Sequence, residues 1–298
     1  MRIIVLFLLS FQLLAQEVIW LKNTPLIRSY SSPRTTDLNN DGVDDVVMGG
    51  GVDGYPTPYG IIAINGVDGT SLWEVETRNE MFTSPQFFDY TSDGISDIII
   101  GGRDAELRLI NGNTGETIWE FWNNESISPN DEGWYNFYTS QLIEDQNGDN
   151  KPDILVANGG DHSLDFSELD RPPGHIMIID GLTGTEFKTA VVPDSNETYM
   201  SPIICDLNGD SNYTILFGTG GEGVAGNLWA TSLTSVLNED ISNAIPLIPN
   251  SELGHIAPPA IGDVNGDEIL DIITQGFDGK LTAIDGSNFN ILWQYEIE

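Results

Sequence analysis

The chain has 298 residues and carries 11 Lys and Arg against 46 Asp and Glu, a formal net charge of −35 at pH 7. Proteins that bind nucleic acids or anionic membranes present basic surfaces, so this balance excludes both classes of partner. Hydrophobic residues make up 40% of the chain, which is enough to bury a core and excludes a chain disordered by composition. The excess negative charge must be neutralised by cations, and divalent cations are the first candidates for that role.

Residues 1–16 have the features of a secretory signal peptide. One positive charge at Arg2 precedes the apolar run 3–9, and the small residue Ala15 lies at the expected cleavage site. A core strand is the alternative interpretation. We expect the mature protein, residues 17–298, to be secreted or held at the cell surface, without a transmembrane segment, because no later stretch is long and apolar enough to span a bilayer. Cys205 is the single cysteine, so disulfides do not contribute to stability.

One unit then repeats five times along the chain. Its copies begin near residues 31, 83, 139, 200 and 257. Each contains an extended segment, an acidic loop, a β-branched run and a Gly-rich connection to a third apolar segment. In every unit except the fourth, an Asn-Gly or Asp-Gly pair that predicts a tight hairpin turn and a closing segment follow. In the second unit these last elements are residues 107–110, Asn111-Gly112 and Ile118-Trp119. Four antiparallel strands per unit predict an all-β propeller of about five blades in one domain.

Two parts of the chain depart from this pattern. In the fourth unit, residues 232–243 have apolar spacing compatible with a short inserted helix. Residues 18–22 and 292–296 both resemble the closing strand of a unit. Because a closed ring needs only one such terminal strand, we expect an incomplete ring and a sequence that is a fragment of a longer protein.

The acidic loops follow the pattern D-x-[NDT]-x-D-x-x-x-D, with oxygen-bearing side chains at positions 1, 3, 5 and 9. Such loops fold around a hard cation, with a backbone carbonyl from position 7, and calcium fits better than magnesium. A helical calcium loop is excluded because position 12 lies inside predicted strands. The alternative is that the Asp-Gly pairs only form turns. The expected ligands of three to five structural calcium ions are Asp37, Asn39, Asp41, Val43 and Asp45; Asp89, Thr91, Asp93, Ile95 and Asp97; Asp145, Asn147, Asp149, Lys151 and Asp153; Asp206, Asn208 and Asp210; and Asp263, Asn265, Asp267, Ile269 and Asp271. In the fourth loop, Thr214 replaces the final carboxylate.

With these loops in register, the unit resembles the FG-GAP and VCBS repeats of integrin-alpha-like propellers. The third and closing segments, such as 279–287 with Leu292-Trp293, are also similar to quinoprotein repeats. The first resemblance implies that partners bind the face opposite the calcium loops. Long connections at 121–138 and 158–174 would lie there.

The first of these connections contains Trp134, Tyr135, Phe137 and Tyr138, and the second contains His162 and Phe166. Clustered aromatics in a loop suit stacking on a sugar or anchoring a protein. The alternative is a satellite cluster that packs the loop itself. His162, His175 and His255 lack metal-ligand spacing and are expected to be ordinary polar loop residues.

The sequence therefore predicts a calcium-binding propeller for adhesion or for recognition of an extracellular protein or glycan. The alternative function is a calcium-dependent polysaccharide lyase on the same scaffold, since rhamnogalacturonan lyases resemble such propellers. No phosphate-binding loop, H-E-x-x-H or G-x-S-x-G motif is present.

Overall fold

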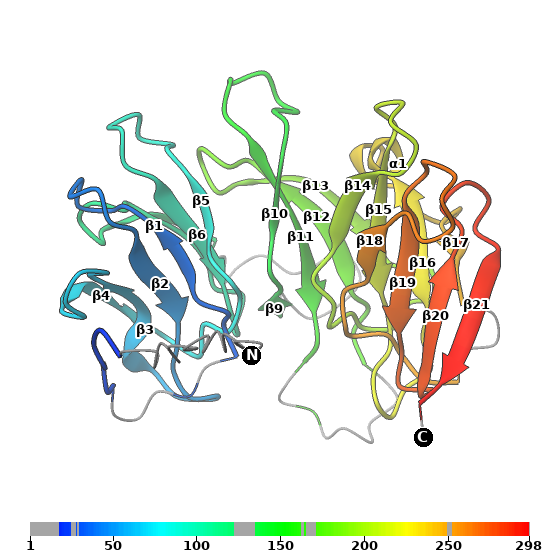
Figure 1. Ribbon diagram of the computed structural model, residues 1–298, viewed down its shortest axis with the longest axis horizontal. Helices are drawn as coiled ribbons and strands as arrows, with labels where there is room; N and C mark the ends of the chain where they lie inside the picture. The colour runs from blue at the N-terminus through cyan, green and yellow to red at the C-terminus, as the bar shows by residue number, and fades with distance from the viewer. Residues whose placement is uncertain are drawn as a thin grey trace, which may run out of the picture.

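The computed structural model describes residues 18–24, 28, 30–121, 135–161, 164, 171–248 and 252–297. The expected signal peptide lies outside these residues. Five antiparallel sheets stand side by side, with the first and last at opposite ends of the row (Figure 1). The prediction of an all-β protein built from five four-stranded blades is confirmed.

Each sheet is formed by strands that follow one another in sequence. Blade one contains β1 (Arg34–Thr36), β2 (Asp45–Gly49), β3 (Thr57–Ile64) and β4 (Ser71–Thr77). Blade two contains β5 (Gln86–Phe88), β6 (Asp97–Gly101), β7 (Leu107–Ile110) and β8 (Thr117–Glu120). Blade three contains β10 (Gln141–Ile143), β11 (Asp153–Gly159), β12 (His175–Ile179) and β13 (Glu186–Val191), with the short β9 (Asn136–Phe137) added on β11.

Blade four contains β14 (Ile203–Asp206), β15 (Tyr213–Gly218), β16 (Leu228–Ser232) and β17 (Ile245–Pro246). Blade five contains β18 (Ala260–Gly262), β19 (Asp271–Gln275), β20 (Lys280–Ile284) and β21 (Ile291–Glu296). The predicted helix of unit four is present as α1 (Leu233–Leu237), whose N-terminus is capped by the Ser232 side chain. No described helix is long and apolar enough to cross a membrane.

Burial along the second strand of each blade depends on how many blades cover it. In β6 and β11 every residue is buried, because both faces of these sheets pack against neighbouring blades. In β2, at one end of the row, buried and half-buried residues alternate. At the other end, β19 has a half-buried residue, Ile273, and an exposed one, Gln275, among its buried residues.

Antiparallel order places the connections of all blades on two faces. The acidic loops, between the first and second strands, share one face with the turns between the third and fourth strands. We call this the acidic face; α1 lies on it, at the top of Figure 1. The connections between second and third strands, and those from blade to blade, lie on the opposite face, which we call the connection face.

The Asn-Gly and Asp-Gly turns on the acidic face are longer than the tight hairpins that the sequence predicts. In blade one the turn runs from Asn65 to Thr70 and is closed by a hydrogen bond from the Asn65 N–H to the Thr70 carbonyl, 2.8 Å. The Asn65 side chain accepts from the Val67 N–H, and Gly69, at φ +74°, takes the left-handed position. The Asn-Gly pair is the first part of the turn, and the residues up to Thr70 complete it.

Candidate functional site

The tips of the acidic loops are held by their own carboxylates. In the first loop, Asp37 accepts backbone N–H groups from Asn40 and Gly42 at 2.8 and 2.9 Å. Asp41 accepts from the Val43 N–H at 2.8 Å. These backbone donors, with Gly42 foremost, hold the pKa of Asp37 below its ordinary value. The loop tip is therefore anionic at neutral pH.

The other loops repeat this arrangement. Position 1 accepts N–H groups from positions 4 to 6 in the loops that begin at Asp89, Asp145, Asp206 and Asp263. The N–H of position 7 donates to the position 5 carboxylate at Ile95, Lys151 and Ile269, as it does at Val43. Lys151 also extends its ammonium group to the carbonyl of Asp89, 3.0 Å away, and so ties the third loop to the second.

Position 9 has a different role from the tip. Asp45, Asp97, Asp153 and Asp271 are fully buried at the start of the second strand. One carboxylate oxygen of each accepts the N–H of position 2 in its own loop at 2.7–3.0 Å. The other oxygen accepts, at 3.0–3.4 Å, the N–H of the glycine in the neighbouring turn: Gly66, Gly112, Gly181 and Gly286. Each carboxylate therefore clamps two loops of one blade together.

Blade four supports this interpretation. Its position 9 is Thr214, and its third strand leads into α1 instead of the glycine-containing turn. The clamp and the turn that it holds are thus absent together from this blade. The Asp at position 9 is tied to the hairpin geometry of each blade, whether or not a metal ion is bound.

A metal ion needs oxygens that converge on one point. Among the described residues, no group of three or more His, Cys, Asp and Glu side chains is placed to hold one. In the fifth loop, however, the Asn265 amide nitrogen lies 3.2 Å from an Asp267 oxygen and 3.5 Å from an Asp271 oxygen. Positions 5 and 9 therefore direct oxygens toward the same place beside position 3. The group between them is the Asn265 amide N–H, and the Asn265 oxygen accepts the Asp267 N–H instead. Calcium remains a prediction that rests on the oxygen-bearing residue types of the loop.

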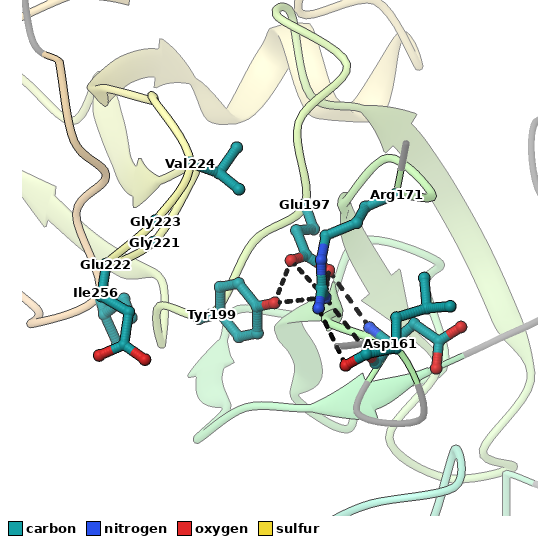
Figure 2. A pocket seen from close by; sticks show the side chains of 10 residues that line it. Asp161, Arg171, Glu197, Tyr199, Gly221, Glu222, Gly223, Val224 and Ile256 are labelled. Atoms are coloured by element: carbon teal, nitrogen blue, oxygen red, sulfur yellow. Dashed lines mark hydrogen bonds and ion pairs between the residues drawn. The ribbon is translucent and has the colours of Figure 1, made fainter. Parts of the chain in front are cut away.

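On the connection face, a pocket of about 280 Å³ opens between blades three and four. Figure 2 shows its lining, with Arg171, Glu197 and Tyr199 directed toward one another. The loop from Gly221 to Val224, together with Ile256, forms the other wall.

A buried ion pair forms the floor of this pocket. The Arg171 guanidinium donates to both carboxylate oxygens of Glu197 at 2.7 and 2.9 Å and to the Tyr199 hydroxyl at 2.9 Å. The Tyr199 hydroxyl also donates to Glu197. Burial, helped by this carboxylate, raises the pKa of Tyr199 above its ordinary value, so the hydroxyl stays protonated. The network fixes polar groups in a concave site, which is the usual form of a ligand pocket.

The residues predicted to bind a ligand do not form one group in the structure. Trp134, His162 and Phe166 lie outside the described residues. Phe137 is fully buried and contacts Phe121 edge-on at 5.0 Å. Tyr138 is also buried and lies behind the pocket, with its ring 6.4 Å from that of Tyr199. Tyr135 is half-buried, and its backbone pairs with the Asn158 side chain. Ligand binding by these residues remains a prediction.

Two expectations about histidines are wrong. His175 begins β12 and is fully buried, and burial lowers its pKa to about 4. His255 is 1% exposed, and neither ring nitrogen has a hydrogen-bond partner in the described structure. His175 is buried at the start of a third strand, and His255, in the connection between blades four and five, packs its ring against Gly276, directly after β19.

The residues predicted from the sequence do not include Arg171, Glu197 or Tyr199. One signal was present: Glu80, Asn136 and Glu197 each stand nine positions before the first Asp of an acidic loop, and all three are buried. Glu80 pairs with Arg103 at 3.1 Å, as Glu197 does with Arg171. A buried carboxylate is destabilising unless a cation pairs with it. The glutamate that recurs before the first strand of a blade therefore indicates a buried ion pair with an arginine.

No protein-family model matches the chain, and no curated protein does either. Solved structures do match. BamB from Moraxella catarrhalis has a TM-score of 0.54 at 14% identity over 93% of this chain and 64% of its own. A quinohemoprotein alcohol dehydrogenase from Comamonas testosteroni has a TM-score of 0.57 at 11% identity, over 89% and 42%. The rhamnogalacturonan lyase YesW has a TM-score of 0.53 at 15% identity, over 88% and 50%.

At these identities the likeness shows the fold alone, and the chain spans two thirds or less of each matched structure. The assignment to FG-GAP and VCBS repeats is wrong: no model of such a family matches, and the similar structures are propellers of other kinds. The physical reason lies in the loops. Their carboxylates satisfy backbone N–H groups that many tight hairpins of this length expose, so the short acidic pattern is not specific to one family.

Proposed function

We propose that the chain is an extracytoplasmic recognition propeller that binds a neutral glycan in the pocket between blades three and four and carries structural calcium on its acidic face. The observation that supports ligand binding is the buried network of Arg171, Glu197 and Tyr199 on the floor of that pocket.

The chemistry of the pocket favours a glycan over other ligands. The exposed Glu222 carboxylate is placed to accept hydrogen bonds from sugar hydroxyls, whereas the Gly221 and Val224 carbonyls of the same loop already accept backbone N–H groups. The half-buried Tyr199 ring offers an aromatic surface of the kind on which sugar rings stack. A net charge of −35 disfavours anionic sugars. The pocket volume suits one sugar ring at the end of a longer chain.

Binding to an array of neutral oligosaccharides, followed by calorimetry on each hit, tests this function. We expect Glu222→Gln to weaken binding about tenfold, close to the loss of one hydrogen bond to a charged group. Glu116→Gln is the matched control, because Glu116 is an exposed residue in a turn on the acidic face. If no neutral glycan binds, or if both substitutions weaken binding equally, the proposed site is wrong.

The calcium proposal is supported by the oxygen set of the loops and by their anionic tips. Each ion would draw together carboxylates that otherwise repel, so its binding stabilises the folded state. We expect Asp41→Ala to lower the melting temperature in millimolar calcium and to change it little in excess chelator. Equal losses in both solutions would contradict a metal role for Asp41. Mass spectrometry under native conditions should count about three to five ions, one for each competent loop.

A further inference from the structure

Three tryptophans make the same contact with the blade that follows them. Each donates its indole N–H to a backbone carbonyl at 2.8–3.0 Å: Trp20 to Gly66, Trp73 to Gly112 and Trp119 to Gly181. Each ring also lies against a second glycine of the same turn, at Gly69, Gly115 and Gly184. A Cβ at Gly115 would lie 2.7 Å from the Trp73 ring, so only glycine permits the contact.

Blade five carries the same tryptophan, and no turn among the described residues receives it. Trp293 pairs across the sheet with Ala283, and Ala283 pairs with Ile273. The equivalent row in blade two, Ile99, Leu109 and Trp119, is buried in the core. Trp293 is 43% exposed against 9% for Trp119, and no described residue accepts its indole N–H.

The rest of β21 extends this surface. Leu292, Tyr295 and the adjoining Ile297 are 36%, 65% and 45% exposed. Isolated exposed apolar residues need no explanation, but a continuous row on a sheet face marks an interaction surface. Elsewhere in the chain, sheet faces with the same row of apolar residues pack against the next blade.

The chain itself contains a turn that accepts such a tryptophan. The turn of blade one, with Gly66 and Gly69, receives Trp20 from residues 18–24, which belong to no strand. This segment is loosely held. Val18, Ile19 and Leu21 are 75–89% exposed, and the side-chain hydrogen bonds described for this segment are those of Trp20 with Gly66 and of Lys22 with Ser71.

We propose that blade five docks on blade one of a second copy of the chain, with Trp293 taking the place of Trp20 in the Gly66–Gly69 turn. The two surfaces differ, so the contact is heterologous and links copies head to tail. Residues 18–24 act as a competitor that covers the receiving turn until a second copy displaces them. The net charge of −35 opposes this association, so salt strengthens it by screening.

Sedimentation velocity of the purified chain over a range of concentrations at high salt tests the proposal. We expect the average mass to rise with concentration. Trp293→Ala should keep the protein monomeric, whereas Trp20→Ala should shift association to about tenfold lower concentration, since it removes the competitor. Tyr55→Ala is the matched control, because Tyr55 is 67% exposed and lies in the β2–β3 connection, on the face opposite the Gly66–Gly69 turn. It should behave as the wild type.

Each possible outcome either supports or overturns the proposal. Association of Trp20→Ala with a monomeric wild type supports the proposal and shows that residues 18–24 block the turn. A monomeric mass for both proteins at all concentrations overturns it, as does association that persists in Trp293→Ala. Far-UV circular dichroism checks that each variant is folded, and Trp293 is exposed enough for its loss to leave the fold intact.

Discussion

His255 occupies a position of the repeat that is apolar in two other blades. Met81, Phe137 and His255 each stand eight positions before the first Asp of an acidic loop, and all are buried. Two buried ring nitrogens without partners cost stability. We expect His255→Met to raise the free energy of unfolding by about 1–2 kcal/mol in urea titrations. His255→Gln keeps a buried polar group and should give no gain; equal gains in both variants would contradict the explanation.

The lowered pKa of His175 makes stability depend on pH. The folded-state pKa is about 4, against 6.5 for the ordinary side chain. Below pH 6.5 the unfolded chain therefore binds a proton that the folded chain excludes, and stability falls as pH falls. We expect the titration of His175 to lower the free energy of unfolding by about 2 kcal/mol between pH 7 and pH 5.

The comparison of wild type with His175→Gln isolates this contribution, because buried carboxyl groups with raised pKa values, such as Glu106, act in the opposite direction in both proteins. Unfolding free energies measured at pH 7 and pH 5 should fall less in the variant than in the wild type. The same decrease in both would exclude His175 as the cause.

At the scale of the element, the buried clamp at position 9 determines how each hairpin closes. Asp97 accepts N–H groups from Tyr90, Thr91 and Gly112 at 2.9, 2.9 and 3.2 Å. Asp97→Ala leaves these donors without an acceptor, so we expect a loss of about 3 kcal/mol or more in the free energy of unfolding. Thr214→Ala, at the same position of the blade that lacks the clamp, should cost less than about 1 kcal/mol.

Chelator distinguishes the clamp from a metal ligand. The loss in Asp97→Ala should persist in excess chelator, because the hydrogen bonds run to the backbone. The loss in Asp41→Ala should not, since Asp41 lies at the exposed loop tip. A loss in Asp97→Ala that disappears in chelator would assign position 9 to the metal alone.

These elements also show what the sequence could predict. Strand order and the helix after Ser232 followed from periodicity, because each blade carries the same local pattern. The role of Asp97 did not follow, because the sequence pattern is the same whether a carboxylate at position 9 binds a cation or accepts backbone N–H groups. Arg171 and Glu197 escaped prediction because they are 26 residues apart and meet only when two connections pack together.

At the scale of the whole molecule, several of the few basic residues are held in ion pairs. Arg78, Arg103, Arg108 and Arg171, four of the 11 basic residues, lie in ion pairs with glutamates on the connection face. The remaining basic residues are far fewer than the 46 carboxylates of the chain. Repulsion among exposed carboxylates destabilises the compact state, and mobile ions screen it within about 10 Å at 0.1 M salt.

We therefore expect the melting temperature to rise by about 3 °C or more when sodium chloride is raised from low concentration to ~0.3 M. Buried ion pairs oppose this trend little, because they are screened less than surface charges. Calcium chloride at matched ionic strength should raise the melting temperature further than sodium or magnesium chloride does, since screening depends on ionic strength whereas a site depends on the ion. A melting temperature that falls with sodium chloride would mean that surface ion pairs, and not repulsion, dominate the electrostatics of this propeller.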